Sequence, residues 1–180
     1  MAEQAMIRFR ARHGQAAPGD RLVDDIIVTL GYRYASTAVP GGVETDPLPA
    51  RLELNGEPGT RAPHVWLRRG ERPASTLDLF TGGFVLLTAP GGESWADAAE
   101  WHTGQWPQVP LRAVPVSAEV AAAYGLGDGG AALVRPDAFV AWRSAGRTGD
   151  PRSVLVDIIG RTLSRVGYAR PGLSSHPAHL

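Results

Sequence analysis

The chain has 180 residues, of which 43% are hydrophobic, so it can form one domain with a core and still carry an additional segment. Its 18 basic and 18 acidic residues cancel, and a formal net charge of zero provides no overall field that would attract nucleic acid or an anionic membrane. The absence of cysteine excludes disulfides, cysteine-based zinc sites and thiol chemistry.

The first 34 residues contain two expected elements and no targeting signal. Residues 2–13 are expected to form a short helix, which the Pro-Gly-Asp sequence at 18–20 ends. Residues 26–34 are rich in β-branched and aromatic side chains and are expected to form a strand. Because neither a signal-peptide core nor a run of 18 apolar residues is present, we expect a soluble cytoplasmic protein.

The next segment is rich in proline and glycine and suggests a domain boundary. Residues 44–58 combine these with Asp and Asn, which indicates an extended linker rather than packed structure. We therefore divide the chain into an N-terminal extension and linker at 1–58, a folded domain at 59–168 and a disordered tail at 169–180.

Strands and helices alternate in the second part of the chain. The expected elements are, in chain order, a strand at 65–67, a short strand or helical turn at 75–80, a strand at 84–88, a helix from 94 to about 104, a strand at 109–116, a short helix at 118–124, a hairpin of 131–135 and 139–143, and a helix from Asp150-Pro151. The apolar run at 84–88 is typical of a strand buried on both faces. A β-α-β unit followed by a hairpin and a closing helix is the plan of an α/β, thioredoxin-like fold, with helices flanking a central mixed sheet.

Several signals refine the two long helices. Ser94 and Asp97 resemble a capping box, and Asp150 is expected to cap the last helix. The residues expected to face the core are Trp95, Ala98, Ala99 and His102 in the first helix, and Val154, Leu155, Ile158, Ile159 and Leu163 in the last. Trp101 falls off the apolar face and is expected at an interface, while His102 is expected to cap the helix C-terminus as a cation.

The sequence argues against redox, cofactor and metal chemistry in this chain. The loop at 89–95, where a thioredoxin-like enzyme carries its reactive cysteine, has none. The glycine-rich stretch at 125–130 precedes a strand and contains Asp128, which favours a turn over a phosphate cradle. His102, His176 and His179 do not have the spacing of metal ligands. We therefore expect no cofactor-binding and no metal-binding residues.

Six residues remain as candidates for a site. His64 is a candidate general base if Asp78 orients it. Alternatively, the sequence from Arg61 to His64 is structural and ties the linker to the domain through backbone hydrogen bonds. The full set consists of the catalytic candidates His64, Asp78, Tyr32 and Arg61 and the substrate-binding candidates Trp66 and Tyr34.

Four stretches of the chain resemble a known family. They are Gly-Thr-Arg-Ala-Pro-His-Val-Trp-Leu at 59–67, Ser-Thr-Leu-Asp-Leu-Phe at 75–80, the glycine-rich stretch and hairpin at 124–143, and Gly-Tyr-Arg-Tyr with Ser36 and Ala38-Val39 at 31–39. Together they resemble the thioredoxin-like C-terminal domain of FAD-dependent aromatic-ring hydroxylases, especially those that oxidise aromatic polyketides. The resemblance runs from about residue 31 to residue 162. It implies that FAD binds to segments upstream of this module, and monooxygenation by this chain alone is not expected.

Two classes of function follow from the resemblance. The first is a non-catalytic accessory or dimerisation domain, redox-inactive, whose partner is a flavin hydroxylase or a second copy of the chain. The alternative is a cofactor-independent cyclase or isomerase, or a binding protein, for an aromatic polyketide. Neither nucleic acid nor a membrane is an expected partner.

Overall fold

The computed structural model describes residues 26–33, 52–69 and 72–163. The helix expected at 2–13 and the tail expected at 169–180 lie outside these residues. From residue 66 onward the elements are β1 (Trp66–Arg69), β2 (Arg72–Ser75), the 3₁₀ helix η1 (Thr76–Leu79), β3 (Phe84–Thr88), α3 (Glu93–Gln105), β4 (Leu111–Pro115), α4 (Ala118–Ala123), β5 (Ala131–Val134), β6 (Val140–Ser144) and α5 (Pro151–Thr162).

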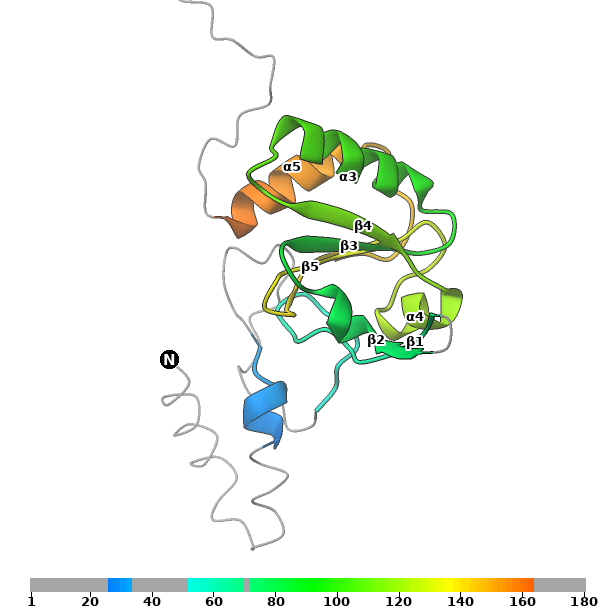
Figure 1. Cartoon of the computed structure of the whole chain (residues 1–180), viewed down its shortest axis with the longest axis vertical. Coiled ribbons are helices and arrows are strands. Elements are labelled where there is room, and N and C mark those ends of the chain that lie inside the picture. Colours follow the sequence, from blue (N-terminus) through cyan, green and yellow to red (C-terminus); the bar gives the residue numbers. More distant parts are fainter. Residues whose placement is uncertain (1–25, 34–51, 70–71, 164–180) are drawn as a thin grey trace, which may run out of the picture.

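Four strands form one mixed sheet in the order β4-β3-β5-β6, and β1 pairs with β2 in a separate antiparallel ribbon. β3 runs parallel to β4 and antiparallel to β5, which forms a hairpin with β6. A β-α-β unit through α3 is thus followed by a hairpin and closed by α5, which confirms the thioredoxin-like α/β fold. In Figure 1, α3 and α5 lie on one side of the sheet, and α4 and the β1–β2 ribbon lie on the other.

The central strand β3 supplies side chains to both faces of the sheet. All five of its residues are buried. Phe84 and Leu86 join the cluster beneath α3 and α5, whereas Val85 and Leu87 join the cluster on the opposite face. This alternation follows from the two-residue period of a strand. The continuous apolar run is therefore a strand buried on both faces, as predicted.

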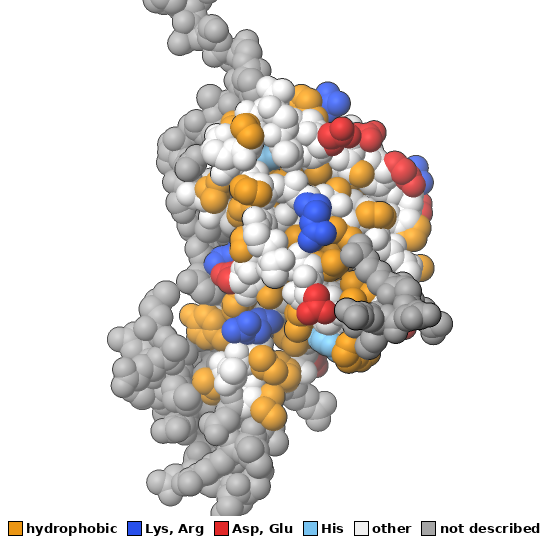
Figure 2. Space-filling view, in the orientation of Figure 1, with side chains coloured by type: hydrophobic (Ala, Val, Ile, Leu, Met, Phe, Trp, Pro, Cys, Tyr) orange, Lys and Arg blue, Asp and Glu red, His pale blue; other side chains and the backbone are white. Residues whose placement is uncertain are grey.

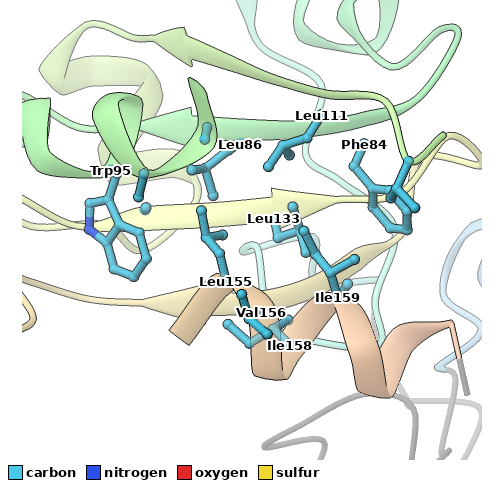
Figure 3. Packing of buried hydrophobic residues seen from close by; sticks show 14 of the residues in the cluster. Phe84, Leu86, Trp95, Leu111, Leu133, Leu155, Val156, Ile158 and Ile159 are labelled. Carbon is cyan, nitrogen blue, oxygen red and sulfur yellow. The ribbon is translucent and has the colours of Figure 1, made fainter. Parts of the chain in front are cut away.

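The cluster between the sheet and the two long helices is almost entirely aliphatic and aromatic. In Figure 3, Leu155 and Ile159 project from α5 toward the strand that carries Leu133, and Trp95 of α3 lies at one end. Leu155, Ile159 and Leu133 are fully buried. Since one fully buried aliphatic side chain contributes roughly 1.5–3 kcal/mol, this layer is a major source of stability.

The two long helices begin in different ways. Asp150 caps α5 as predicted, because its carboxylate accepts a hydrogen bond from the Ser153 N–H (3.2 Å). The capping box expected at Ser94 is wrong, since α3 begins at Glu93 after Gly92, with no side-chain cap. The physical reason is a tight backbone turn. Gly92 N–H donates to Ala89 O (3.0 Å), and a Cβ at Gly92 would lie 2.8 Å from that oxygen.

The strand expected at 26–34 is wrong for its first residues. Residues 26–30 are helical, and Gly31 N–H donates to Ile27 O (2.8 Å). Ile27 is buried, while Ile26 and Leu30 are exposed. β-Branched side chains favour a strand only where a neighbouring strand is available. No strand among the described residues pairs with this segment, so its backbone groups bond within a helical turn.

The expected linker is packed against the domain at its end. Gly56 is buried with φ of +75°, and a Cβ there would lie 2.6 Å from Tyr124 O. The Arg143 guanidinium donates to Asn55 O (3.0 Å) and to Tyr124 O (3.2 Å). The expectation of an unpacked linker is therefore wrong for these residues, although residues 34–51 lie outside the described part of the chain.

Candidate functional site

The segment from Gly59 to Pro63 enters the domain along the edge of β6. Gly59 N–H donates to Val140 O (2.8 Å), Val140 N–H returns a bond to Thr60 O (2.9 Å), and Ala62 N–H donates to Ala138 O (2.8 Å). We call residues 59–63 the entry segment. Its backbone bonds support the structural interpretation of the Arg61–His64 sequence, because backbone groups rather than the Arg61 and His64 side chains make these contacts.

Two buried hydroxyl groups hold the end of the entry segment. Pro63 O accepts hydrogen bonds from the Tyr124 hydroxyl (2.8 Å) and the Thr76 hydroxyl (2.7 Å). Thr76 also accepts from Val65 N–H (3.0 Å). Burial raises the pKa of Tyr124 to about 12, so its hydroxyl keeps its proton at neutral pH. We call Tyr124, Thr76 and Pro63 the anchor; sequence analysis missed it, because Tyr124 and Pro63 lie 61 residues apart.

His64 and Asp78 are not paired in the structure. The His64 side chain is exposed and lies edge-on to Trp66, with 4.8 Å between ring centroids. The Asp78 carboxylate accepts from Ser75 N–H (2.8 Å) and completes the capping box of η1. Among the described residues, no hydrogen bond or ion pair joins His64 to Asp78. A general base oriented by a carboxylate is therefore not assembled here.

The other candidates lie apart from this pair or beyond the described residues. The Arg61 guanidinium lies 5.0 Å from the centroid of the Phe139 ring, and its buried Nε has no hydrogen-bond partner. This is a cation–π contact between the entry segment and the residue that precedes β6. Tyr32 is partly buried, and Tyr34 lies outside the described residues. Trp66 is 65% exposed.

The junction between β3 and α3 is the place where a thioredoxin-like enzyme carries its reactive cysteine. Here it is joined directly to the loop before β5. Gly129 N–H donates to Pro90 O (2.7 Å), Ala89 N–H donates to Gly130 O (2.9 Å), and the Trp95 indole N–H donates to Gly129 O (3.1 Å). Three hydrogen bonds thus close this junction.

Charged side chains cover the same junction. Asp128 and Arg147 form an exposed ion pair (3.1 Å), and a Cβ on Gly91 would lie 2.6 Å from the Asp128 carboxylate. A Cβ on Gly129 would collide with the Arg147 side chain. The ion pair is worth little by itself, whereas Gly91 and Gly129 have φ of +77° and +69°, which residues other than glycine rarely adopt.

The glycine-rich loop does not fit the pyrophosphate of a flavin nucleotide. A phosphate cradle requires backbone N–H groups that point outward to the ligand. Gly127 N–H donates to Ala145 O (2.7 Å), Gly130 N–H donates to Gly127 O (3.0 Å), and Gly129 N–H is used at the junction. The Asp128 carboxylate would also repel a phosphate. The loop is a turn, as the sequence predicts.

Two aromatic predictions for α3 need correction. Burial lowers the pKa of His102 from 6.5 to about 4, so its ring is neutral at pH 7 and is not the expected helix-capping cation. Trp101 is partly buried and packs against the core cluster, so the expectation that it falls off the apolar face is wrong, while its place at an interface stays a prediction. Its ring centroid lies 5.7 Å from that of Trp106, and the Arg152 guanidinium lies 5.3 Å from it.

Within residues 26–33, 52–69 and 72–163, no three acidic or histidine side chains gather as a metal site. His176 and His179 lie outside these ranges. Among the helices that the structure describes, none has the length and apolar character needed to cross a bilayer.

Comparison with known proteins gives a consistent result. Residues 55–165 match the family described as "Aromatic-ring hydroxylase, C-terminal". The chain is 45% identical over 173 residues to tetracenomycin B2 monooxygenase-dioxygenase of Streptomyces olivaceus. The aligned region covers 92% of the chain and 32% of that protein. The chain is also 42% identical to 4-methyl-5-nitrocatechol 5-monooxygenase of Burkholderia sp, over 80% of the chain and 29% of that protein.

Solved structures show the same domain. Aklavinone-11 hydroxylase in its complex with FAD and aklavinone matches with a TM-score of 0.67 and 39% identity, over 78% of this chain and 28% of the hydroxylase. The rebeccamycin biosynthetic enzyme RebC with reduced flavin matches with a TM-score of 0.61 and 32% identity, over 81% of this chain and 25% of RebC. The chain thus spans about a third or less of each of these relatives. Since the family match covers more than half of its 180 residues, the chain belongs to the aromatic-ring hydroxylase C-terminal domain family.

Proposed function

We propose that this chain acts as a non-catalytic, redox-inactive accessory module of a flavin hydroxylase. It binds the flavin-containing part of such an enzyme or a second copy of itself. Family membership supports this role, because the chain corresponds to 32% of the tetracenomycin relative and 28% of the aklavinone hydroxylase. In this proposal the rest of such an enzyme holds FAD and the aromatic substrate.

The observation that carries this proposal is the closed β3–α3 junction. Thiol–disulfide exchange requires an accessible, low-pKa cysteine at the start of this helix. The chain has no cysteine, and Trp95, Pro90 and Gly129 are instead joined by hydrogen bonds. Because the polar groups of this junction form hydrogen bonds within the chain, the junction supports a structural role.

The proposal assigns neither a catalytic group nor a cofactor to this chain. His64 and Asp78 are not paired with each other, and the amides of Gly127 and Gly129 donate to other carbonyls of the chain. In a hydroxylase FAD activates oxygen, and in this proposal the rest of that enzyme performs this step. The described residues of this chain contribute a rigid fold and a surface.

Two measurements on the intact chain test this role. In size-exclusion chromatography with light scattering and an absorbance spectrum, the chain alone should elute without flavin absorbance. Mixed with the flavin-loaded portion of the tetracenomycin relative, truncated before the third that this chain matches, it should form a 1:1 complex. Flavin absorbance in the peak of the chain alone would contradict the proposal, and so would the absence of both the 1:1 complex and a dimer of the chain.

One observation favours a second candidate, the binding of an aromatic metabolite. The Trp66 ring is 65% exposed and has His64 at its edge, so a planar ligand has a face on which to stack. Titration with aklavinone should then quench tryptophan fluorescence saturably, and Trp66→Ala should abolish the quenching. Conversion of the ligand in the same samples would favour a cyclase or isomerase over a binding protein.

A further inference from the structure

Exposed large hydrophobic side chains occur in two segments of the described structure, the helical turn at 26–30 and residues 66–77. Four of the described residues belong to this class, and they are Ile26, Leu30, Trp66 and Leu77. None of them lies on α3 or α5. An isolated exposed aliphatic residue is ordinary, but an indole with 65% of its surface in water is unusual outside interfaces.

The backbone beneath Trp66 is held in place. Val65 N–H donates to the Thr76 hydroxyl (3.0 Å), and Thr76 N–H donates to Val65 O (2.9 Å). Trp66 lies opposite Ser75 in the β1–β2 ribbon, and Leu77 follows Ser75 by two residues. These side chains are thus presented from a rigid frame, which lowers the entropic cost of binding.

We propose that His64, Trp66 and Leu77, which we call the Trp66 surface, dock the upstream, flavin-containing part of an aromatic-ring hydroxylase. The inference rests on the proposed function and identifies the surface that performs it. Trp66 is the central residue of the contact, because binding energy at interfaces is concentrated in buried aromatic residues surrounded by weaker contacts. His64 contacts its edge, and Leu77 lies two residues beyond Ser75, which pairs with Trp66 in the ribbon.

The position of the surface points to this occupant. The Trp66 surface adjoins the entry segment, so it lies on the side from which the chain reaches the domain. In Figure 1, residues 26–30 also lie on the side of the sheet away from α3 and α5, and Arg33 contacts Glu57 (3.5 Å) just before the entry segment. The match to the tetracenomycin relative covers 92% of this chain but 32% of that protein. The family is a C-terminal domain, so in such a protein the larger part precedes this domain and joins it through the entry segment.

The charge pattern is compatible with a largely apolar contact. Figure 2 shows acidic and basic side chains scattered among hydrophobic ones on the face that it presents, with no field of a single sign. The formal net charge of the whole chain is zero. Apolar contacts with a polar rim are typical of stable interfaces, whereas charge steering requires a dominant sign.

A binding experiment with the intact 180-residue chain tests the inference. The probe is the upstream portion of the tetracenomycin relative, purified as a monodisperse sample that retains FAD. Isothermal titration calorimetry would compare the wild-type chain with Trp66→Ala and Arg161→Ala. We expect Trp66→Ala to weaken binding about 30-fold, which is the usual effect of removing one central interface residue. Arg161 is an exposed residue of α5, on the other side of the sheet, and its replacement should leave the dissociation constant within twofold.

The outcomes separate this inference from the proposed function. Wild-type binding that Trp66→Ala leaves unchanged would overturn the Trp66 surface and leave the accessory role intact. Failure of the wild-type chain to bind the FAD-loaded probe would overturn the Trp66 surface as assigned, and it would overturn the accessory role as well if the chain is also monomeric by light scattering. Dimers of the chain alone that dissociate in Trp66→Ala would assign the surface to a second copy and overturn the present assignment. Circular dichroism must show that Trp66→Ala is folded, which its 65% exposure leads us to expect.

Discussion

The two faces of the four-stranded sheet are covered by different kinds of structure. On one face, α3 and α5 pack long apolar stripes over β3 and β5. On the other, α4, η1 and the entry segment are short, and polar groups tie them together through the anchor. The first face is stabilised by close packing of buried side chains, so that a cavity there is costly. The second depends on individual hydrogen bonds and on close backbone contacts at glycine.

One face of the sheet therefore mainly stabilises the domain, and the other mainly positions the entry segment. The helical face offers few exposed apolar side chains, while the other face fixes the entry segment and presents Trp66 to solvent. A domain that must stay folded while joined to a larger body benefits from this division. Substitutions of buried residues on the helical face should destabilise the domain strongly, and those near the entry segment should shift its position with a smaller loss of stability.

The largest effect is expected for Leu155→Ala on α5. The side chain is fully buried between the helix and the sheet, so its removal should lower the free energy of unfolding by about 2–5 kcal/mol. Urea denaturation at pH 7 measures the change. The exposed Arg161→Ala on the same helix should change stability by less than about 0.5 kcal/mol. A loss below about 1 kcal/mol for Leu155→Ala would show that this face is not the stabilising one.

Acid should weaken the same face through His102. Since its folded pKa of about 4 lies below its ordinary 6.5, the unfolded chain binds a proton between these values and the folded chain does not. The contribution of His102 to the free energy of unfolding is therefore fully present above pH 6.5. It is lost as the pH drops toward 4, and the loss is roughly 3 kcal/mol at most. Carboxylates titrate in the same range, so the measurement compares urea unfolding of wild type and His102→Gln between pH 7 and pH 4.5. Parallel pH profiles would rule out His102 as the cause.

Local signals in the sequence were sufficient to predict the helical face. The stripe on α5, its Asp150 cap and the apolar run of β3 depend on neighbours within a few residues, and each is confirmed. The start of α3 was misjudged because a backbone turn at Gly92 replaces the capping side chain. The helix at 26–30 was misjudged because β propensity depends on an available neighbouring strand.

The polar face could not be derived from sequence in the same way. The anchor joins Pro63 to a hydroxyl 61 residues away, and no local pattern indicates that contact. The same applies to the neutral state of His102, which depends on burial rather than on its place at a helix end. His64 and Asp78 were plausible partners by residue type, but spacing alone does not set the direction of a side chain.

A pair of glycine substitutions tests whether close contact matters on the polar face. Gly56 and Gly82 both have positive φ, +75° and +80°, which costs an alanine about 1–2 kcal/mol at either position. A Cβ at Gly56 would also meet the Tyr124 backbone at 2.6 Å, whereas nothing lies within 4 Å of one at Gly82. Gly56→Ala should therefore be less stable than Gly82→Ala by a further ~1 kcal/mol or more. Equal losses in urea denaturation would mean that the end of the linker does not press on α4.

The smallest effect is expected for Tyr124→Phe in the anchor. Pro63 O would lose one of its two hydrogen bonds but keep the one from Thr76, so no buried group is left without a partner and the loss should be about 1 kcal/mol. Thr76→Val should cost more, because it also removes the acceptor for Val65 N–H. The double variant leaves Pro63 O with neither bond, and its loss should exceed the sum of the single losses if both hydroxyls act on the same oxygen. Additive losses in urea denaturation would instead mean that the two hydroxyls stabilise the entry segment independently, and that the polar face is a set of separate contacts rather than one anchor.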